Sequence, residues 1–142
     1  MTITYFAYGA NLDVPAMQRR CPGAVPLQTA CLAGHRLVSM REGWLSIVPS
    51  EDTDVEGLLW RLTPEHLVAL DGYEEVEEGM YVHEQRRVRA SDGTMLEALL
   101  YIGTNSGPGV LNGEYAGRVA RAALAVIGED VAQTIRRLAD PT

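Results

Sequence analysis

The chain has 142 residues, of which 46% are hydrophobic, and a formal net charge of −7 at pH 7. Its length and apolar content predict a single compact domain over residues 1–142 with its own core. The negative charge argues against nucleic acid as a partner, because such binding needs clustered Lys and Arg, and against an anionic membrane surface.

No apolar run reaches the roughly 18 residues of a membrane-spanning helix, and the first residues lack a basic, apolar leader, so we expect a cytoplasmic protein. Two cysteines, Cys21 and Cys31, are too few for a disulfide framework and are interpreted as free thiols. The three histidines show no metal-ligand spacing with one another or with the cysteines, so the sequence predicts no bound metal.

The first half of the chain is predicted to be mostly strand. Residues 2–8 are rich in β-branched and aromatic types. Asp13 is a predicted cap for a helix that continues to about Arg20, with Pro15 in its first turn. The further strands are expected as two short pieces within 25–40, separated by Gly34, and as two more at 45–49 and 55–62.

The second half alternates helix and strand. Thr63-Pro64 predicts the start of a helix that ends near Gly72, with Thr as the cap and Pro in the first position. Asp92-Gly93 between two β-like runs predicts a hairpin. Helices are expected over 113–127, capped by Asn112, and over about 129–139. About six strands and three or four helices indicate an α+β fold with a mixed or largely antiparallel sheet.

The first strand runs directly into Tyr8-Gly9-Ala10-Asn11-Leu12, just before the first predicted helix. Gly9 has no Cβ, so its backbone can approach a ligand closely. Amides near a helix start can bind a carboxylate or a developing oxyanion. The alternative is an ordinary turn in which Asn11 caps itself, and these residues alone leave both readings open.

A second segment, residues 70–82, holds four glutamates within five positions. Crowded or buried carboxylates raise one another's pKa, which suits a general base that must also return its proton. The alternative is a solvated acidic loop, and the spacing singles out no member of the group. The four residues are Glu74, Glu75, Glu77 and Glu78.

Taken together, the motifs resemble those of the γ-glutamylcyclotransferase-like (BtrG-like, AIG2-like) family. "YGANL" is similar to the family's Tyr-Gly-Ser-Asn-Leu, and "VEGLLWRLTPEHLVALD" to its Val-x-Gly-x-x-(Tyr/Trp) strand with the following helix. "LD", Glu74 and "GMYV" resemble the block that carries the catalytic glutamate, and "ALLYIGTN" a later strand with a tyrosine. The matches keep the family's order and cover about residues 5–105.

This resemblance implies a small mixed, mostly antiparallel β-barrel with flanking helices. It also implies a reaction that needs no cofactor: the α-amino group of a γ-glutamyl substrate attacks its own γ-carbonyl, 5-oxoproline forms, and the amine departs. By position in the motif, Glu74 is the general acid/base. The substrate-binding positions implied by the resemblance are Tyr8, Gly9, Ala10, Asn11, Leu12, Tyr81 and Tyr101, although core packing would also explain the last two.

The chain departs from the family pattern at two positions. Glu75 stands where the family commonly has Gly, so either Glu74 or Glu75 is the proton carrier. Ala10 replaces the usual Ser, which matters only if the hydroxyl contributes to binding. Arg118 and Arg121 could hold a substrate carboxylate or form surface ion pairs, and the loop at 105–113 could shape the leaving-group pocket.

Three hypotheses follow from the sequence. The first is a γ-glutamyl cyclotransferase that acts on a small-molecule γ-glutamyl amino acid or γ-glutamylamine. The second is a small-molecule binding module with the same fold and no turnover, which Ala10 and Glu75 motivate. The third is a pathway-specific enzyme that removes a γ-glutamyl protecting group from an amide. The sequence leaves the leaving amine open and is compatible with a monomer or a homodimer.

Overall fold

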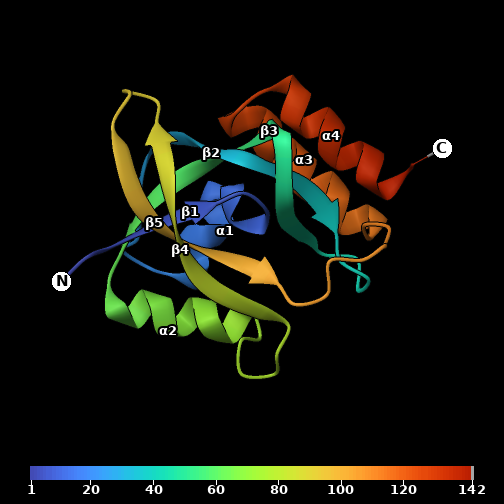
Figure 1. Cartoon of the computed structure of the whole chain (residues 1–142). Helices are drawn as coiled ribbons and strands as arrows, with labels where there is room; N and C mark the ends of the chain where they lie inside the picture. Colours follow the sequence, from blue (N-terminus) through green and yellow to red (C-terminus); the bar gives the residue numbers. More distant parts are fainter. Residues whose placement is uncertain (142) are drawn as a thin grey trace.

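The structure is a computed structural model that describes residues 1–141. In these residues five strands form a closed barrel, with helices packed around it (Figure 1). The elements in chain order are β1 (Ile3–Ala7), the 3₁₀ helix η1 (Ala10–Leu12), α1 (Val14–Arg20), β2 (Val25–Ser39), β3 (Leu45–Leu62), α2 (Pro64–Tyr73), β4 (Tyr81–Ala90), β5 (Met95–Gly103), α3 (Gly113–Val126) and α4 (Glu129–Ala139).

The barrel is mixed and mostly antiparallel, which confirms the predicted fold class. The strand order is β1-β3-β2-β4-β5, and a parallel pairing of β1 with β5 at Tyr5 and Leu99 closes it. Every other neighbouring pair is antiparallel. Closure matters for the site because it brings the C-terminal end of β1 beside residues from the distant β4–β5 hairpin.

The strand count differs from the prediction because two predicted breaks lie inside continuous strands. β2 passes through Gly34, and β3 through residues 50–53, where the register of the β2–β3 ladder shifts between Ala33 and His35. Gly34 has a φ of 73°, in the left-handed region that favours glycine. Pro49 and the acidic residues after it weaken the strand pattern, but the backbone continues as a bulged ladder.

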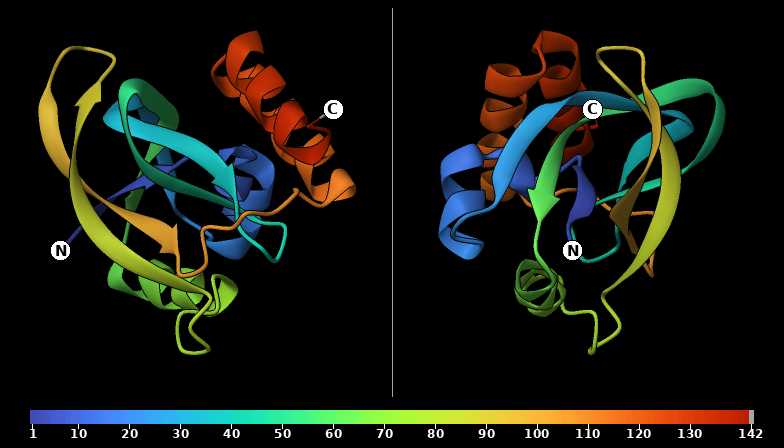
Figure 2. Two further views of the ribbon diagram at one scale, coloured as in Figure 1. Left: turned by 45° about the vertical axis from the view of Figure 1, so that its right-hand side comes forward. Right: turned by 90° about the vertical axis from the view of Figure 1, so that its left-hand side faces the viewer.

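The helices occupy two separate sides of the barrel. α3 and α4 pack side by side, while α2 lies on the opposite side (Figures 1 and 2). The residues with the largest fully buried side chains come from strands and helices alike and form one core with the barrel lining: Trp60, Phe6, Leu12, Met17, Met40, Leu45, Ile47, Leu59, Leu62, Leu70, Leu100 and Ile135. No helix within residues 1–141 has the length and apolar character needed to cross a membrane.

Local capping explains where the helices begin. The Asp13 carboxylate accepts a hydrogen bond of 3.2 Å from the Ala16 N–H, as the sequence predicted. Thr63 caps α2 in a capping box with His66, whose Nδ1 accepts from the Thr63 N–H at 3.0 Å. Asn112 precedes α3 at the predicted position but makes no side-chain cap, and its side chain lies against Gly43.

Gly57 sets the position of β1 within the barrel. A Cβ atom at this residue would overlap the backbone oxygen of Ala7 and the ring of Phe6. Glycine is therefore needed for β1 to approach β3 this closely. The same approach fixes the end of β1, from which Tyr8 and the following loop extend.

Candidate active site

A cavity of about 280 Å³ lies where the end of β1 meets the end of α2. This size suits a small molecule. Its walls come from segments far apart in the sequence, and all six tyrosines of the chain contribute to them. The lining residues are Tyr5, Tyr8, Gly9, Ala10, Asn11, Trp44, Leu45, Tyr73, Glu74, Glu75, Met80, Tyr81, Tyr101, Tyr115 and Arg118.

The first wall is the loop after β1, held by hydrogen bonds to buried groups. The Trp60 Nε1–H donates to the Asn11 backbone oxygen at 3.1 Å, and the Asn11 Nδ2 donates to the Tyr5 hydroxyl at 3.0 Å. Asn11 is only 2% exposed, and its side chain makes no cap on η1. The alternative of a self-capping turn is therefore not what the structure shows.

The start of η1 provides backbone N–H groups on this wall that the hydrogen bonds of the turn do not use. The first bond within the turn runs from the Leu12 N–H to the Gly9 oxygen at 2.9 Å. The N–H groups of Gly9, Ala10 and Asn11 precede that bond, so the turn does not use them. Gly9 has a φ of −128°, and a Cβ there would stand 3.5 Å from the Tyr115 hydroxyl. The lack of a Cβ at Gly9 leaves space in the cavity, whereas the backbone conformation of Gly9 does not require glycine.

The predicted binding residues do not all reach the cavity. Tyr8, Gly9, Ala10 and Asn11 line it, as do Tyr81 and Tyr101. Leu12 is fully buried in the core, outside this lining. Its side chain anchors the loop, so any contribution to binding is indirect.

The second wall carries the acidic residues that follow α2. Glu74 is the C-cap of this helix, and its N–H donates to the Leu70 oxygen at 2.8 Å. Its side chain is half-buried and lines the cavity. Burial raises the pKa of Glu74 to about 7; the charge of Glu75 adds to the rise and that of Arg20 opposes it. A carboxyl with this pKa is able both to accept and to return a proton near neutral pH.

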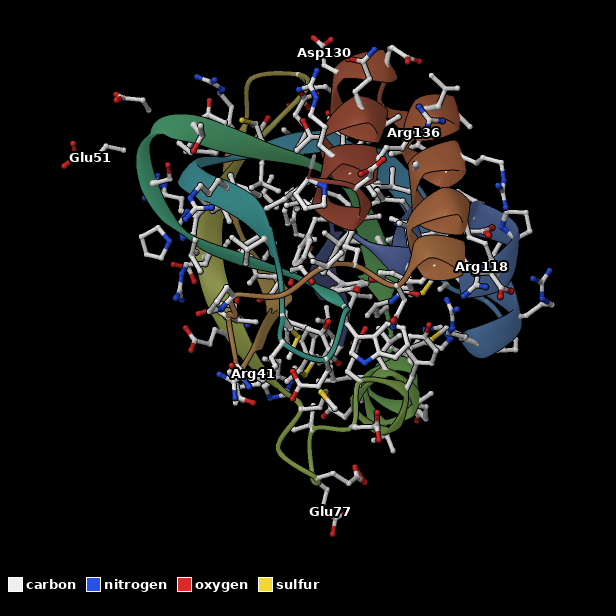
Figure 3. The ribbon with its side chains drawn as sticks, turned by 90° about the vertical axis from the view of Figure 1, so that its right-hand side faces the viewer. Arg41, Glu51, Glu77, Arg118, Asp130 and Arg136 are labelled. Atoms are coloured by element: carbon white, nitrogen blue, oxygen red, sulfur yellow. The ribbon has the colours of Figure 1, made fainter. Side chains whose placement is uncertain are left out.

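The other glutamates of this segment lie in different surroundings. Glu75 lines the cavity but is exposed, and its φ of 53° lies in the left-handed region that favours glycine. Glu77 and Glu78 are exposed, and Glu77 extends away from the barrel at the outer end of the connector (Figure 3). Of the four, Glu74 is the one that combines partial burial, cavity lining and a raised pKa.

Three tyrosine hydroxyls brace the cavity walls. Tyr8 donates to the Tyr101 backbone oxygen, and Tyr81 donates to the Leu45 backbone oxygen, each at 2.6 Å. Tyr101 donates to the Asp71 carboxylate at 2.6 Å, which ties β5 to α2 one turn before Glu74. Burial raises the pKa of each of these tyrosines, so the hydroxyls stay neutral.

Two further tyrosines, which the sequence reasoning did not select, offer donors. The Tyr5 hydroxyl accepts from Asn11, and the Tyr115 hydroxyl accepts from the Leu45 N–H at 3.3 Å. Each of these hydrogen bonds leaves the hydroxyl's own hydrogen available to a bound molecule. Burial keeps the pKa of both groups high, so both remain donors.

The sequence reasoning also did not place Trp44, Tyr73 and Met80 in a site, and it left Arg118 between a substrate contact and a surface ion pair. Trp44 packs edge-to-face on Tyr115 with ring centroids 5.0 Å apart. Arg118 lies three residues after Tyr115, so both are on the same face of α3, and both line the cavity. This spacing in the sequence could have indicated that the two residues lie together. Arg118 also pairs with Glu114 at 3.1 Å, so both roles considered from the sequence are compatible with its position.

The residues that the structure describes do not include a cluster of metal-ligating side chains. Within residues 1–141, no three His, Cys, Asp or Glu side chains are grouped so that they could hold an ion. The polar groups of the residues that line the cavity include hydroxyls, amides, carboxyls and one guanidinium. These groups suit proton transfer and hydrogen bonding to a small polar molecule.

The closed mixed barrel and the half-buried carboxyl in its small-molecule cavity define the class of fold and site, and comparison with known proteins gives the family. The family model described as "Gamma-glutamyl cyclotransferase, AIG2-like" matches residues 5–118. The chain belongs to this family, as the resemblance of its motifs predicted.

Individual relatives agree with this assignment. The chain is 32% identical over 114 residues to a mouse gamma-glutamylcyclotransferase, covering 73% of the chain and 61% of the relative. It is 30% identical over 111 residues to the human protein of that name, covering 71% and 59%. The matched region thus spans about three-fifths of the length of these curated relatives.

Solved structures share the fold. A gamma-glutamyl cyclotransferase superposes with a TM-score of 0.87 at 23% identity, over 96% of this chain and 87% of the other. A human protein described as uncharacterised gives a TM-score of 0.86 at 24% identity, over 95% and 86%. At these identities the likeness establishes the barrel and its helices.

Proposed function

We propose that this chain is a γ-glutamyl cyclotransferase, with Glu74 as the general acid and base. The observation that carries the proposal is the meeting of two walls in one cavity: the Glu74 carboxyl, with a pKa near 7, and the unused amides of the first loop. Family membership supports the proposed reaction class, and the geometry supports the role proposed for each group.

The proposed reaction needs one proton carrier. The Glu74 carboxylate takes a proton from the substrate's α-ammonium group, and the freed amine attacks the γ-carbonyl carbon of the same molecule. The C–N bond to the leaving group then breaks as the Glu74 carboxylic acid returns the proton to the departing nitrogen. The ring nitrogen gives its second proton, through the same carboxylate, to the released amine, which leaves as an ammonium ion. One γ-glutamyl amide thus gives one 5-oxoproline and one amine, and the enzyme regains its initial charge.

Binding must fold the substrate so that its two ends meet. Well-oriented intramolecular reactions reach effective molarities of about 10⁵–10⁸ M, so orientation supplies much of the acceleration. In this proposal the amides of Gly9, Ala10 and Asn11, which line the cavity, bind the α-carboxylate or the carbonyl oxygen as it gains charge. The hydroxyls of Tyr5 and Tyr115 add donors at the same cavity, and no cofactor enters the scheme.

The test is product formation. The purified protein is incubated with a panel of γ-glutamyl amino acids and γ-glutamylamines, and 5-oxoproline and the released amine are quantified. Glu74→Gln should lower turnover about 10²–10⁴-fold, the usual contribution of general acid–base catalysis. Glu75→Gln decides between the neighbouring carboxyls, and Glu77→Gln, which alters an exposed residue of the same segment, is the matched control.

Two outcomes would overturn the proposal. Full turnover in Glu74→Gln, with loss in Glu75→Gln, would assign the proton transfer to the neighbour. Calorimetric binding of a γ-glutamyl compound, with no 5-oxoproline at any pH, would favour the binding module instead.

A further inference from the structure

Arg20 lies behind the cavity, at the junction of its two walls. It is the last residue of α1 and half-buried, and it is not among the residues that line the cavity. Its Nη1 donates to the Asn11 Oδ1 at 2.6 Å, which is short even for a charge-assisted bond. It therefore holds the side chain that also supports Tyr5.

The same guanidinium reaches the second wall. Its carbon lies 4.0 Å from the centroid of the Tyr73 ring, within the range of a cation–π contact. Tyr73 is the last residue of α2 and directly precedes Glu74. One side chain thus contacts a residue of the first loop and the residue next to the proposed proton carrier.

We propose that Arg20 is a positioning residue that couples the two walls of the site: it holds the first loop against the end of α2 and places its positive charge beside Glu74. This inference deepens the proposed function and rests on it for the kinetic consequence. Arg20 acts through Asn11, Tyr73 and its own charge, without touching the substrate.

Among the charges near Glu74, that of Arg20 is the one that favours the ionised carboxylate. Burial and the charge of Glu75 raise the pKa of Glu74, whereas the charge of Arg20 lowers it. The tyrosines stay neutral near pH 7 because burial raises the pKa of each, and Arg118 shares its guanidinium with Glu114. The titratable and charged groups that face this carboxyl across the cavity or beside it are Tyr5, Tyr8, Arg20, Tyr73, Glu75, Tyr81, Tyr101, Tyr115 and Arg118.

Three variants separate charge from packing. Arg20→Gln removes the charge and replaces the guanidinium by a shorter neutral amide, and Arg20→Lys keeps the charge but loses the planar group that stacks on Tyr73. Arg19→Gln removes the same charge from the neighbouring, exposed position of α1 and is the matched control. The Glu74 carboxyl is titrated in each by carbon NMR, with Glu74→Gln used to assign its signal.

The proposal predicts a shift in this titration for Arg20→Gln and little for the other two. We expect the Glu74 pKa to rise by about one unit in Arg20→Gln and to stay within about 0.3 in Arg20→Lys and Arg19→Gln. The acid limb of kcat/KM should move by the same amount. At pH 6.5 this lowers kcat/KM about eightfold, and near pH 9 the loss should almost disappear.

A merely structural role gives a different pattern. It would lower kcat/KM equally at pH 6.5 and pH 9 and leave the titration of Glu74 unchanged, and either result overturns the proposal. The NMR titration does not depend on turnover. If the protein forms no 5-oxoproline, the proposed function fails, while the coupling of Arg20 to Glu74 is still confirmed or refuted by the titration.

Discussion

The two walls of the cavity are built in opposite ways. The first loop is secured on every side, because Asn11 is buried and bonded through both its backbone and its side chain to Trp60, Tyr5 and Arg20. The end of α2 instead carries two adjacent carboxyl groups. Glu74 is half-buried and ionises with a pKa of about 7, and Glu75 is exposed and has a left-handed backbone conformation.

This contrast matches the division of labour in the proposed reaction. A wall that binds and orients must keep its donors fixed, since each displaced donor weakens the stabilisation of developing charge. A group that carries a proton instead needs a finely balanced environment, and partial burial of a carboxylate supplies it at a cost in stability. Two properties can be tested by mutation: whether the first wall is rigidly held, and whether burial of the Glu74 carboxylate lowers the stability of the protein.

Gly57→Ala should give the largest effect, because it breaks the support of the first wall. The added Cβ would overlap the Ala7 backbone oxygen, and β1 would have to move. We expect a loss of more than about 3 kcal/mol in the free energy of unfolding, measured by urea denaturation. Gly72→Ala in α2 meets no atom within 4 Å and should be neutral or stabilising, so equal losses in both would contradict this reading.

The pH dependence of stability tests the cost of the second wall. The pKa of Glu74 is raised from 4.5 to about 7, so the native state binds more protons than the unfolded state between these values. The free energy of unfolding must therefore fall as pH rises through this window, by roughly 2 kcal/mol between pH 5 and pH 8.

Glu74→Gln should remove this contribution. Its advantage over the wild type should be larger at pH 8 than at pH 5 by the same amount in urea denaturation. Glu77→Gln, at an exposed position, provides the comparison. An advantage of Glu74→Gln that does not change with pH would show that the carboxyl is ionised at no cost.

Asn11→Ala tests the fixed wall at a single side chain. It leaves the Arg20 guanidinium and the Tyr5 hydroxyl without their shared partner. Unpaired buried groups cost about 1–3 kcal/mol, so we expect a loss of about 2 kcal/mol in the free energy of unfolding. Asn112→Ala removes an asparagine that makes no side-chain cap and should cost less than about 0.5 kcal/mol. Similar losses in the two variants would mean that the Asn11 network adds little.

Glu75→Gly should give the smallest change and sharpen the comparison further. Glycine adopts the left-handed conformation at this position without the steric cost that Glu75 carries. We expect a gain of about 1 kcal/mol, seen as a rise in Tm of about 3 °C. Glu77→Gly, in the same connector but without a positive φ, should lower Tm. A lower Tm in Glu75→Gly would show that other contacts of Glu75 outweigh the strain.

Local signals in the sequence predicted the parts of the fold that depend on local physics. Asp13 and Thr63 form the predicted caps, because a short oxygen-bearing side chain before a helix satisfies nearby amides. The breaks expected at Gly34 and after Pro49 were wrong as strand ends, because pairing with the neighbouring strand continues the ladder past them. Tertiary hydrogen bonding outweighed local propensity there.

For the site, the ordered motifs led to Glu74 and the first loop but not to the rest of the cavity. Tyr5, Trp44 and Tyr115 reach it from β1, the β2–β3 turn and α3, and only the tertiary packing of the whole chain brings these segments together. The sequence spacing between them carries no signal of that contact. Leu12 shows the converse, because adjacency in a motif placed it in the site while its apolar side chain turned into the core.

The pH dependence of kcat/KM for 5-oxoproline formation tests the central claim most directly. If the half-buried carboxyl of Glu74 carries the proton, the acid limb of the wild-type profile should report a group with a pKa of about 7. A limb near 4.5, the value of an ordinary exposed glutamate, would contradict the account, because the proton carrier would then lie outside the cavity's desolvated wall.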